Sequence, residues 1–167
     1  MNKIDALKKY IFAEMSKHEK LEGLNKIDTF IKSLNKEQID FLANYLSKIR
    51  HNCVYKKILQ SKNVYKSEIP ISQIEIGKIN EFVNPLLEQI NFRLSRVLED
   101  DKICTHKEFN SDKNDITKLD ERLSVFIAEK TVDKYKLIDG NHRAINLVSK
   151  NNLDNLALII LEMGSQT

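Results

Sequence analysis

The chain has 167 residues, of which 41% are apolar and 31% are charged, enough for one domain or for a small domain with a helical attachment. No apolar run approaches the roughly 20 residues of a membrane span, and Met1 to Asp5 begin no secretory signal, so we expect a cytoplasmic protein without membrane contact. Aromatic residues make up only 7% and Trp is absent, which argues against a base-stacking surface for single-stranded nucleic acid.

The net charge of +3 is unevenly distributed along the chain. Residues 1–66 contain 14 Lys and Arg against 7 Asp and Glu, whereas residues 67–167 contain 13 against 17. A basic segment of this kind favours contact with a polyanion such as DNA. A lysine-rich helix surface that faces only solvent explains the same charge.

Residues 3–66 predict helices throughout. Apolar residues recur there at spacings of three and four: Ile4, Leu7, Ile11, Phe12, Leu24, Ile27, Phe30 and Ile31. Gly23 predicts the break between the first and second helices, and Asn35 with Gln38 predicts the capping box of a third. No turn signature fixes a helix-turn-helix, and a docking or dimerisation bundle, including a homodimer of this chain, fits the same pattern.

The spacing of apolar residues changes from helix-like to strand-like near residue 66. Residues 67–74 alternate as in a strand, and Pro70 confines that strand to a sheet edge or to a strand start. Pro85 predicts the first turn of a helix that runs to about Leu98. Residues 105–118 are polar and predict a loop.

The last third of the chain predicts a hairpin over residues 122–129 and 134–138, and a buried strand over 156–161. Between them, Asp139 and Gly140 form a turn, and the next helix follows directly. The whole pattern predicts an α+β fold, with a basic helical region over residues 1–66 and a mixed α/β domain over residues 67–167.

The turn residues Asp139, Gly140, Asn141, His142 and Arg143 predict an anion site. A helix N-terminus offers unpaired N–H groups and the positive end of the helix dipole. Gly140 would let a ligand approach the backbone, and His142 and Arg143 add two side-chain donors, a combination that suits phosphate. For His142 and Arg143, the alternative is a structural pair that caps the turn or bridges to an acidic neighbour.

This order of strand, Asp-Gly-Asn-His-Arg turn, helix and buried strand resembles the core of the ParB/sulfiredoxin superfamily. The resemblance covers residues 122–162, is weaker over 67–100 and does not reach residues 1–66. It implies that Gly140, Asn141, His142 and Arg143 bind the phosphate of a nucleotide or nucleic acid. Sulfiredoxins have a reactive cysteine where this chain has Asn141, so we expect no sulfiredoxin activity. Partition proteins add a helix-turn-helix after the turn, and because the sequence ends at Thr167 we expect no partition clamp.

Other members are similar to small-molecule kinases or are described as ParB-like nucleases. The resemblance therefore implies phosphoryl transfer, or hydrolysis of a nucleotide or phosphodiester. Such an enzyme needs a base and commonly Mg²⁺ with its nucleotide. Asp139, Glu75 and Glu68 are the candidate catalytic carboxylates, and Asp139 is the best placed of them. The alternatives are a turn-forming role for Asp139 and exposed strand-end positions for the two glutamates.

The sequence also contains two cysteines near two histidines, namely His51, Cys53, Cys104 and His106. Their spacing is not a common zinc spacing, so we assign no metal site to them and expect small buried thiols. The alternative function is non-catalytic, namely a DNA-binding or regulatory protein whose helical half contacts DNA or a protein partner.

Overall fold

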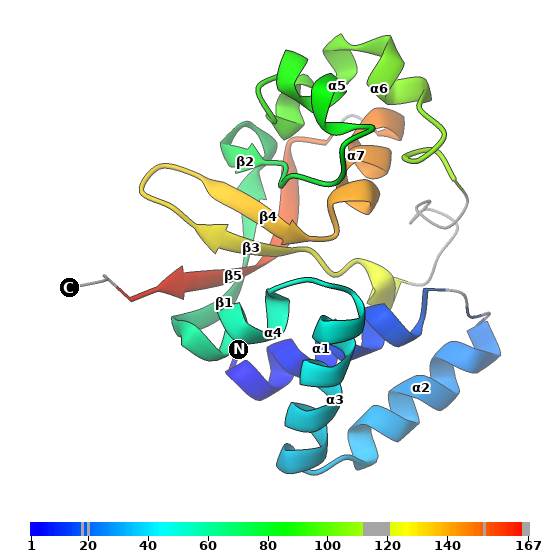
Figure 1. Ribbon diagram of the computed structural model, residues 1–167, viewed down its shortest axis with the longest axis vertical. Coiled ribbons are helices and arrows are strands. Elements are labelled where there is room, and N and C mark those ends of the chain that lie inside the picture. The colour runs from blue at the N-terminus through cyan, green and yellow to red at the C-terminus, as the bar shows by residue number, and fades with distance from the viewer. Residues whose placement is uncertain (18, 20, 112–120, 152, 165–167) are drawn as a thin grey trace.

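The computed structural model describes residues 1–17, 19, 21–111, 121–151 and 153–164. Within these residues the chain has an α+β fold, as predicted, with a mixed five-stranded sheet between two groups of helices (Figure 1). The N-terminal helices are α1 (Lys3–Met15), α2 (Leu21–Ser33), α3 (Lys36–Ile49) and α4 (Val54–Gln60). The strands are β1 (Ser61–Pro70), β2 (Ile74–Glu75), β3 (Ile127–Lys130), β4 (Tyr135–Asp139) and β5 (Asn155–Met163). The other helices are α5 (Asn84–Gln89), α6 (Asp101–Thr105) and α7 (Asn141–Lys150), with short 3₁₀ helices at Ile71–Gln73, Leu94–Glu99 and Glu121–Leu123.

The strand order is β1-β5-β3-β4-β2. Strands β3 and β4 form the predicted hairpin, β5 runs parallel to β3 and antiparallel to β1, and β2 runs parallel to β4. The predicted buried strand over 156–161 is confirmed as part of β5, which lies between two other strands. Strand β1 lies at an edge and ends at Pro70, in agreement with the edge position that this proline predicted.

Two apolar cores lie on opposite faces of the sheet. On β5, Leu158 and Ile160 belong to the core that contains α7, whereas Ile159 and Leu161 belong to the core that contains α1. This alternation follows from the two-residue period of a strand. Because the buried face of α1 packs on the sheet, the helical half and the sheet share one of the two cores.

The helical prediction is wrong for residues 61–66, which form the first part of β1. Val64 in this part pairs with Leu161 of β5, and Ile69 further along pairs with Leu156. This long-range pairing decides the conformation, because the local spacing of apolar residues there suits either element. The break predicted at Gly23 is also wrong, since Gly23 lies inside α2 and α1 already ends at Met15.

The helix that begins near Pro85 ends at Gln89, earlier than the predicted Leu98. Asn91 and Phe92 adopt φ values of 51° and 53°, and the Phe92 N–H donates to the Leu87 carbonyl at 2.8 Å. These left-handed residues reverse the chain before the 3₁₀ helix at Leu94–Glu99.

One further predicted bound differs from the structure, and one predicted loop is only partly described. The first hairpin strand begins at Ile127, because Arg122 belongs to a 3₁₀ helix. Of the loop predicted over 105–118, residues 112–118 lie outside the described residues.

The predicted start of the third helix is confirmed. The Asn35 side chain accepts the Gln38 N–H at 2.9 Å, and the Gln38 side chain accepts the Asn35 N–H at 2.9 Å. In the part of the chain that the structure describes, none of the helices has the length and apolar character of a membrane span.

Candidate functional site

Strand β4 leads into α7 through Gly140, which has a φ of 84°. A Cβ on this residue would lie 2.9 Å from the Val125 carbonyl oxygen and 2.9 Å from a ring carbon of Phe126. The turn itself therefore requires glycine, without reference to a ligand. No side chain caps α7. The first backbone hydrogen bond of the helix is donated by the Ala144 N–H to the Gly140 carbonyl at 2.9 Å. The N–H groups at the start of α7 thus have no partner within the helix.

Asn141, the first residue of α7, ties the helix to the loop that follows β2. Its side-chain oxygen accepts the Gly77 N–H at 2.8 Å. The two segments approach closely, since a Cβ on Gly77 would lie 2.4 Å from the Leu137 carbonyl oxygen. Asn141 therefore has a structural contact at the position where the resemblance implies a phosphate contact.

His142 lies against the ring of Phe109, with 5.7 Å between ring centroids, and its Nε2 is 3.6 Å from a Glu108 carboxylate oxygen. Burial lowers the pKa of His142 below its ordinary value, and hydrogen bonding to Glu108 opposes this shift. The imidazole is therefore neutral near pH 7, and it can both donate and accept a hydrogen bond.

Arg143 is held at the base of the turn, and 11% of its side chain is exposed. Its guanidinium donates to the Leu123 carbonyl, and its Nη2 lies 3.8 Å from Asp139 Oδ2. Arg143 thus joins α7 to the segment before β3 and places a positive charge beside the turn.

Asp139 ends β4 with 15% of its side chain exposed. Its Oδ2 has no hydrogen-bond partner among the described residues, because the nearby guanidinium of Arg143 is too distant. Burial raises the pKa of Asp139, Arg143 opposes this, and the charge of Glu14 adds to it. A buried carboxyl group of raised pKa at a cavity wall is typical of acid–base sites.

These residues line a cavity of about 530 Å³ between α1 and the turn. The turn residues 139–143 form one wall, and the end of α1 with Asn52 forms another. The described residues that line the cavity are Ala13, Ser16, Lys17, Glu19, Asn52, Ile79, Glu108, Ser111, Leu123, Ile138, Asp139, Gly140, Asn141, His142 and Arg143.

The end of α1 contributes to the cavity in a way that the sequence does not predict. Lys17 lines the cavity and is paired with Glu14, its Nζ lying 2.7 Å from a carboxylate oxygen. Ser16 and Asn52 line it too. No motif marks these three residues, because only tertiary packing places the end of α1 and the Asn52 segment, which contacts Tyr10 of α1, at this cavity.

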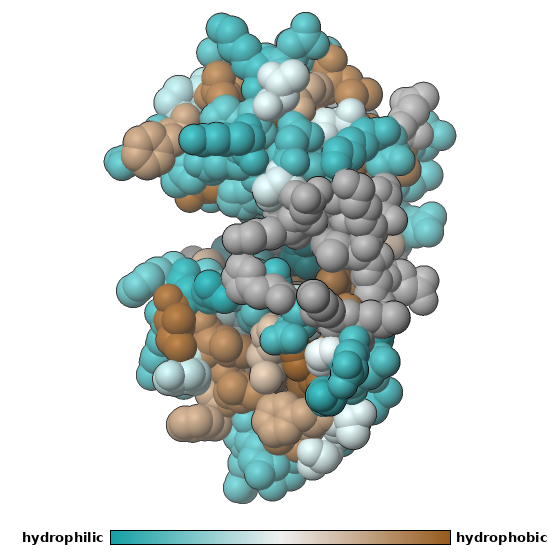
Figure 2. Space-filling view, turned by 90° about the vertical axis from the view of Figure 1, so that its right-hand side faces the viewer, coloured by the Kyte–Doolittle hydropathy of each residue, from teal (hydrophilic) through white to brown (hydrophobic). Residues whose placement is uncertain are grey.

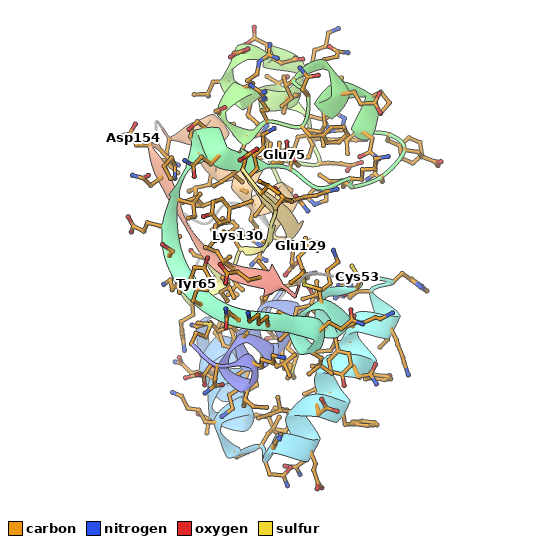
Figure 3. All side chains as sticks on the ribbon, turned by 90° about the vertical axis from the view of Figure 1, so that its left-hand side faces the viewer. Cys53, Tyr65, Glu75, Glu129, Lys130 and Asp154 are labelled. Atoms are coloured by element: carbon orange, nitrogen blue, oxygen red, sulfur yellow. The ribbon has the colours of Figure 1, made fainter. Side chains whose placement is uncertain are left out.

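Glu75 and Glu68 are not among the residues that line the cavity. Glu75 forms an ion pair with Lys134, with 2.5 Å between Glu75 Oε1 and Lys134 Nζ. This pair lies at the end of β4 away from Asp139, and Glu75 is labelled in Figure 3. Glu68 is exposed on β1 and pairs with Ala157 of β5. Since β5 and β3 separate β1 from β4, Glu68 is about 14 Å or more from the turn by strand spacing alone.

Of the two thiols, Cys53 is exposed and Cys104 is half-buried, so the prediction of buried thiols is wrong for Cys53. The Cys104 thiol donates to the Val97 carbonyl at 3.2 Å. Within the described residues, no group of three or more His, Cys, Asp and Glu side chains is arranged to hold a metal ion.

Comparisons with protein-family models, with curated proteins and with solved structures give no match to this chain. The resemblance to the ParB/sulfiredoxin superfamily therefore stays a prediction from the motif and its setting.

Proposed function

We propose that the cavity binds a nucleotide or another phosphate-bearing ligand, with the phosphate at the N-terminus of α7. The observation that carries this proposal is an uncapped helix N-terminus at the wall of a ligand-sized cavity. His142, Arg143 and Lys17 line the same cavity and can add donors or positive charge. The cavity suits a single nucleotide or smaller phosphate ester better than duplex DNA.

The chemistry that best fits this site is phosphoryl transfer or nucleotide hydrolysis, with Asp139 as the acid–base residue. Its raised pKa and its unpartnered Oδ2 allow it to take a proton from an attacking hydroxyl or water. Glu108 and Glu19 also line the cavity, and carboxylate oxygens are a donor type that Mg²⁺ accepts when it is bound mainly through nucleotide phosphates. Bound Mg²⁺ would offset charge on those phosphates.

Calorimetric titration of the full chain with ATP and CTP, with and without Mg²⁺, tests the binding step. We expect His142→Ala to weaken binding about tenfold, through loss of a ligand hydrogen bond and of the cavity wall. His106→Ala is the matched control, because His106 also lies against Phe109, at 5.5 Å between centroids, but does not line the cavity. Equal affinities for the wild type and both variants would contradict the proposed site.

A measurement of phosphate release or transfer in the presence of Mg²⁺ distinguishes an enzyme from a protein that only binds the nucleotide. We expect Asp139→Asn to lose turnover by at least about 100-fold even when nucleotide is saturating. Nucleotide binding without turnover in the wild type would favour the non-catalytic alternative.

A second candidate function is contact with a partner or DNA through the helical half. Exposed apolar side chains on α3 favour a protein partner, with exposed fractions of 73% for Phe41, 53% for Tyr45 and 50% for Ile49. Figure 2 shows apolar side chains over the lower, helical part of that face, whereas the upper part is mostly hydrophilic. Duplex-DNA binding by the full chain, with affinity that falls steeply as salt rises, would instead favour a DNA-binding role for the basic residues.

A further inference from the structure

Ser16, at the end of α1, has a buried hydroxyl group that no other part of the described chain satisfies. The residue is 2% exposed, lines the cavity, and its Oγ has no hydrogen-bond partner. Ser47 and Ser61 are also buried, but Ser47 donates to the Asn52 carbonyl at 2.8 Å and Ser61 to the Ile58 carbonyl at 2.7 Å. Ser16 is thus the exception among these buried serines, and a buried hydroxyl without a partner is unfavourable.

A second unpartnered polar atom lies at the same cavity. Asp139 Oδ2 is buried and has no hydrogen-bond partner among the described residues; Asp139 lines the cavity from the sheet, whereas Ser16 lines it from the end of α1. Glu14 differs from both, since its buried carboxylate is offset by Lys17 at 2.7 Å and by Arg50 at 2.8 Å. Ser16 Oγ and Asp139 Oδ2, from two walls of the cavity, therefore both lack a hydrogen-bond partner among the described residues.

The two helix ends at the cavity have opposite polarity. Helix α7 begins there and presents the positive end of its dipole, whereas α1 ends at Met15, with Ser16 as its C-cap, and presents the negative end. The carboxyl group of Asp139 adds acidic character beside the end of α1. A phosphate is therefore favoured at α7 and disfavoured beside Ser16, where a hydroxyl or ammonium group is the better occupant.

We propose that Ser16 is a ligand-binding residue, and that the ligand carries, besides its phosphate, a hydrogen-bonding hydroxyl or ammonium group that contacts Ser16 Oγ and Asp139 Oδ2. This rests on the proposed phosphate site at α7. It also makes α1 a part of the binding site, and it assigns the ligand to phosphate esters that carry a second polar group besides the phosphate.

Titration calorimetry with three phosphate compounds tests the proposal on the full chain. Glycerol 3-phosphate has two hydroxyl groups away from its phosphate, n-propyl phosphate is a similar ester without them, and ATP is a larger ester with sugar hydroxyls. We expect glycerol 3-phosphate to bind about fivefold more tightly than n-propyl phosphate. Ser16→Ala should remove this difference and weaken ATP binding about fivefold.

Ser33→Ala is the matched control, because Ser33 ends α2 and donates to the Phe30 carbonyl at 2.7 Å away from the cavity. Removal of an unpartnered hydroxyl should leave the melting temperature of ligand-free Ser16→Ala equal to or above that of the wild type. Unchanged affinities of Ser16→Ala for ATP and glycerol 3-phosphate would overturn the proposal for Ser16 alone. Absence of binding by all three compounds to the wild type would instead contradict the phosphate site itself.

Discussion

At the residue scale, Gly140 is explained by the turn that it forms. Its φ of 84° and the tight approach of Val125 and Phe126 leave no room for a side chain. We expect Gly140→Ala to lower the free energy of unfolding by about 2–4 kcal/mol, from backbone strain and displaced packing together. Urea denaturation measures this, with Gly164→Ala as the control, because a Cβ on Gly164 would meet nothing within 4 Å. Equal losses in the two variants would show that the geometry of the turn is wrong.

Asp139 should give the protein a pH dependence of stability that Asp139→Asn lacks. Burial raises the folded-state pKa of Asp139 above its ordinary value, so the folded state retains this proton to higher pH than the unfolded state does. The contribution is present below the unfolded pKa, about 3.9, and is lost as pH rises through the folded pKa. The free energy of unfolding of the wild type, relative to Asp139→Asn, should fall as pH increases from about 4. A difference that does not change with pH, measured by urea denaturation, would exclude a raised pKa.

The residues of the turn could be found from the sequence, but their contacts could not. Asp139 to Arg143 are adjacent in the chain and occupy the predicted strand, turn and helix start. The contacts of Asn141 with Gly77 and of Arg143 with Leu123 join segments that are distant in sequence. Ser16 could not be identified, because its significance lies in an unmet hydrogen bond that only the folded chain reveals.

At the element scale, the Asn141 side chain connects the start of α7 to the loop after β2 through a hydrogen bond from the Gly77 N–H. We expect Asn141→Ala to cost about 1 kcal/mol of stability and to speed amide hydrogen exchange near Gly77, because the Gly77 N–H loses its acceptor. Hydrogen exchange read by mass spectrometry over the loop measures this directly. Asn151→Ala is the control, since Asn151 donates to the Leu147 carbonyl at the other end of α7. Unaltered exchange near Gly77 in Asn141→Ala would argue against this contact.

Elements set by local chemistry were predicted well, and elements set by long-range pairing were not. The capping box at Asn35, the Pro85 helix start and the hairpin all follow from short-range patterns. The sequence predicts helix for residues 61–66, because nothing in that segment reveals its pairing with β5. It does not predict the early end of the Pro85 helix for a related reason, since Asn91 and Phe92 carry no glycine signal for their left-handed conformation.

At the scale of the whole molecule, the helical half depends on the sheet. Buried residues of α1 such as Leu7 and Ile11 belong to the same core as Ile127, Ile159 and Leu161 of the sheet. We therefore expect residues 1–66 alone to show no cooperative thermal unfolding, since their main apolar face would lack its partner. Circular dichroism melting of this fragment and of the full chain measures the difference. A sharp transition in the isolated fragment would establish an independent helical domain.

In the proposed site, backbone amides at the start of α7 hold a ligand phosphate, in a cavity that α1 completes. The most direct test is a ¹H–¹⁵N NMR titration of the full chain with ATP and Mg²⁺. We expect the largest shift changes at the amides of Gly140, Asn141, His142 and Arg143, with further changes at Ser16 and Lys17. Changes confined to residues of α2 and α3, with the 140–143 amides unmoved at saturation, would contradict this account.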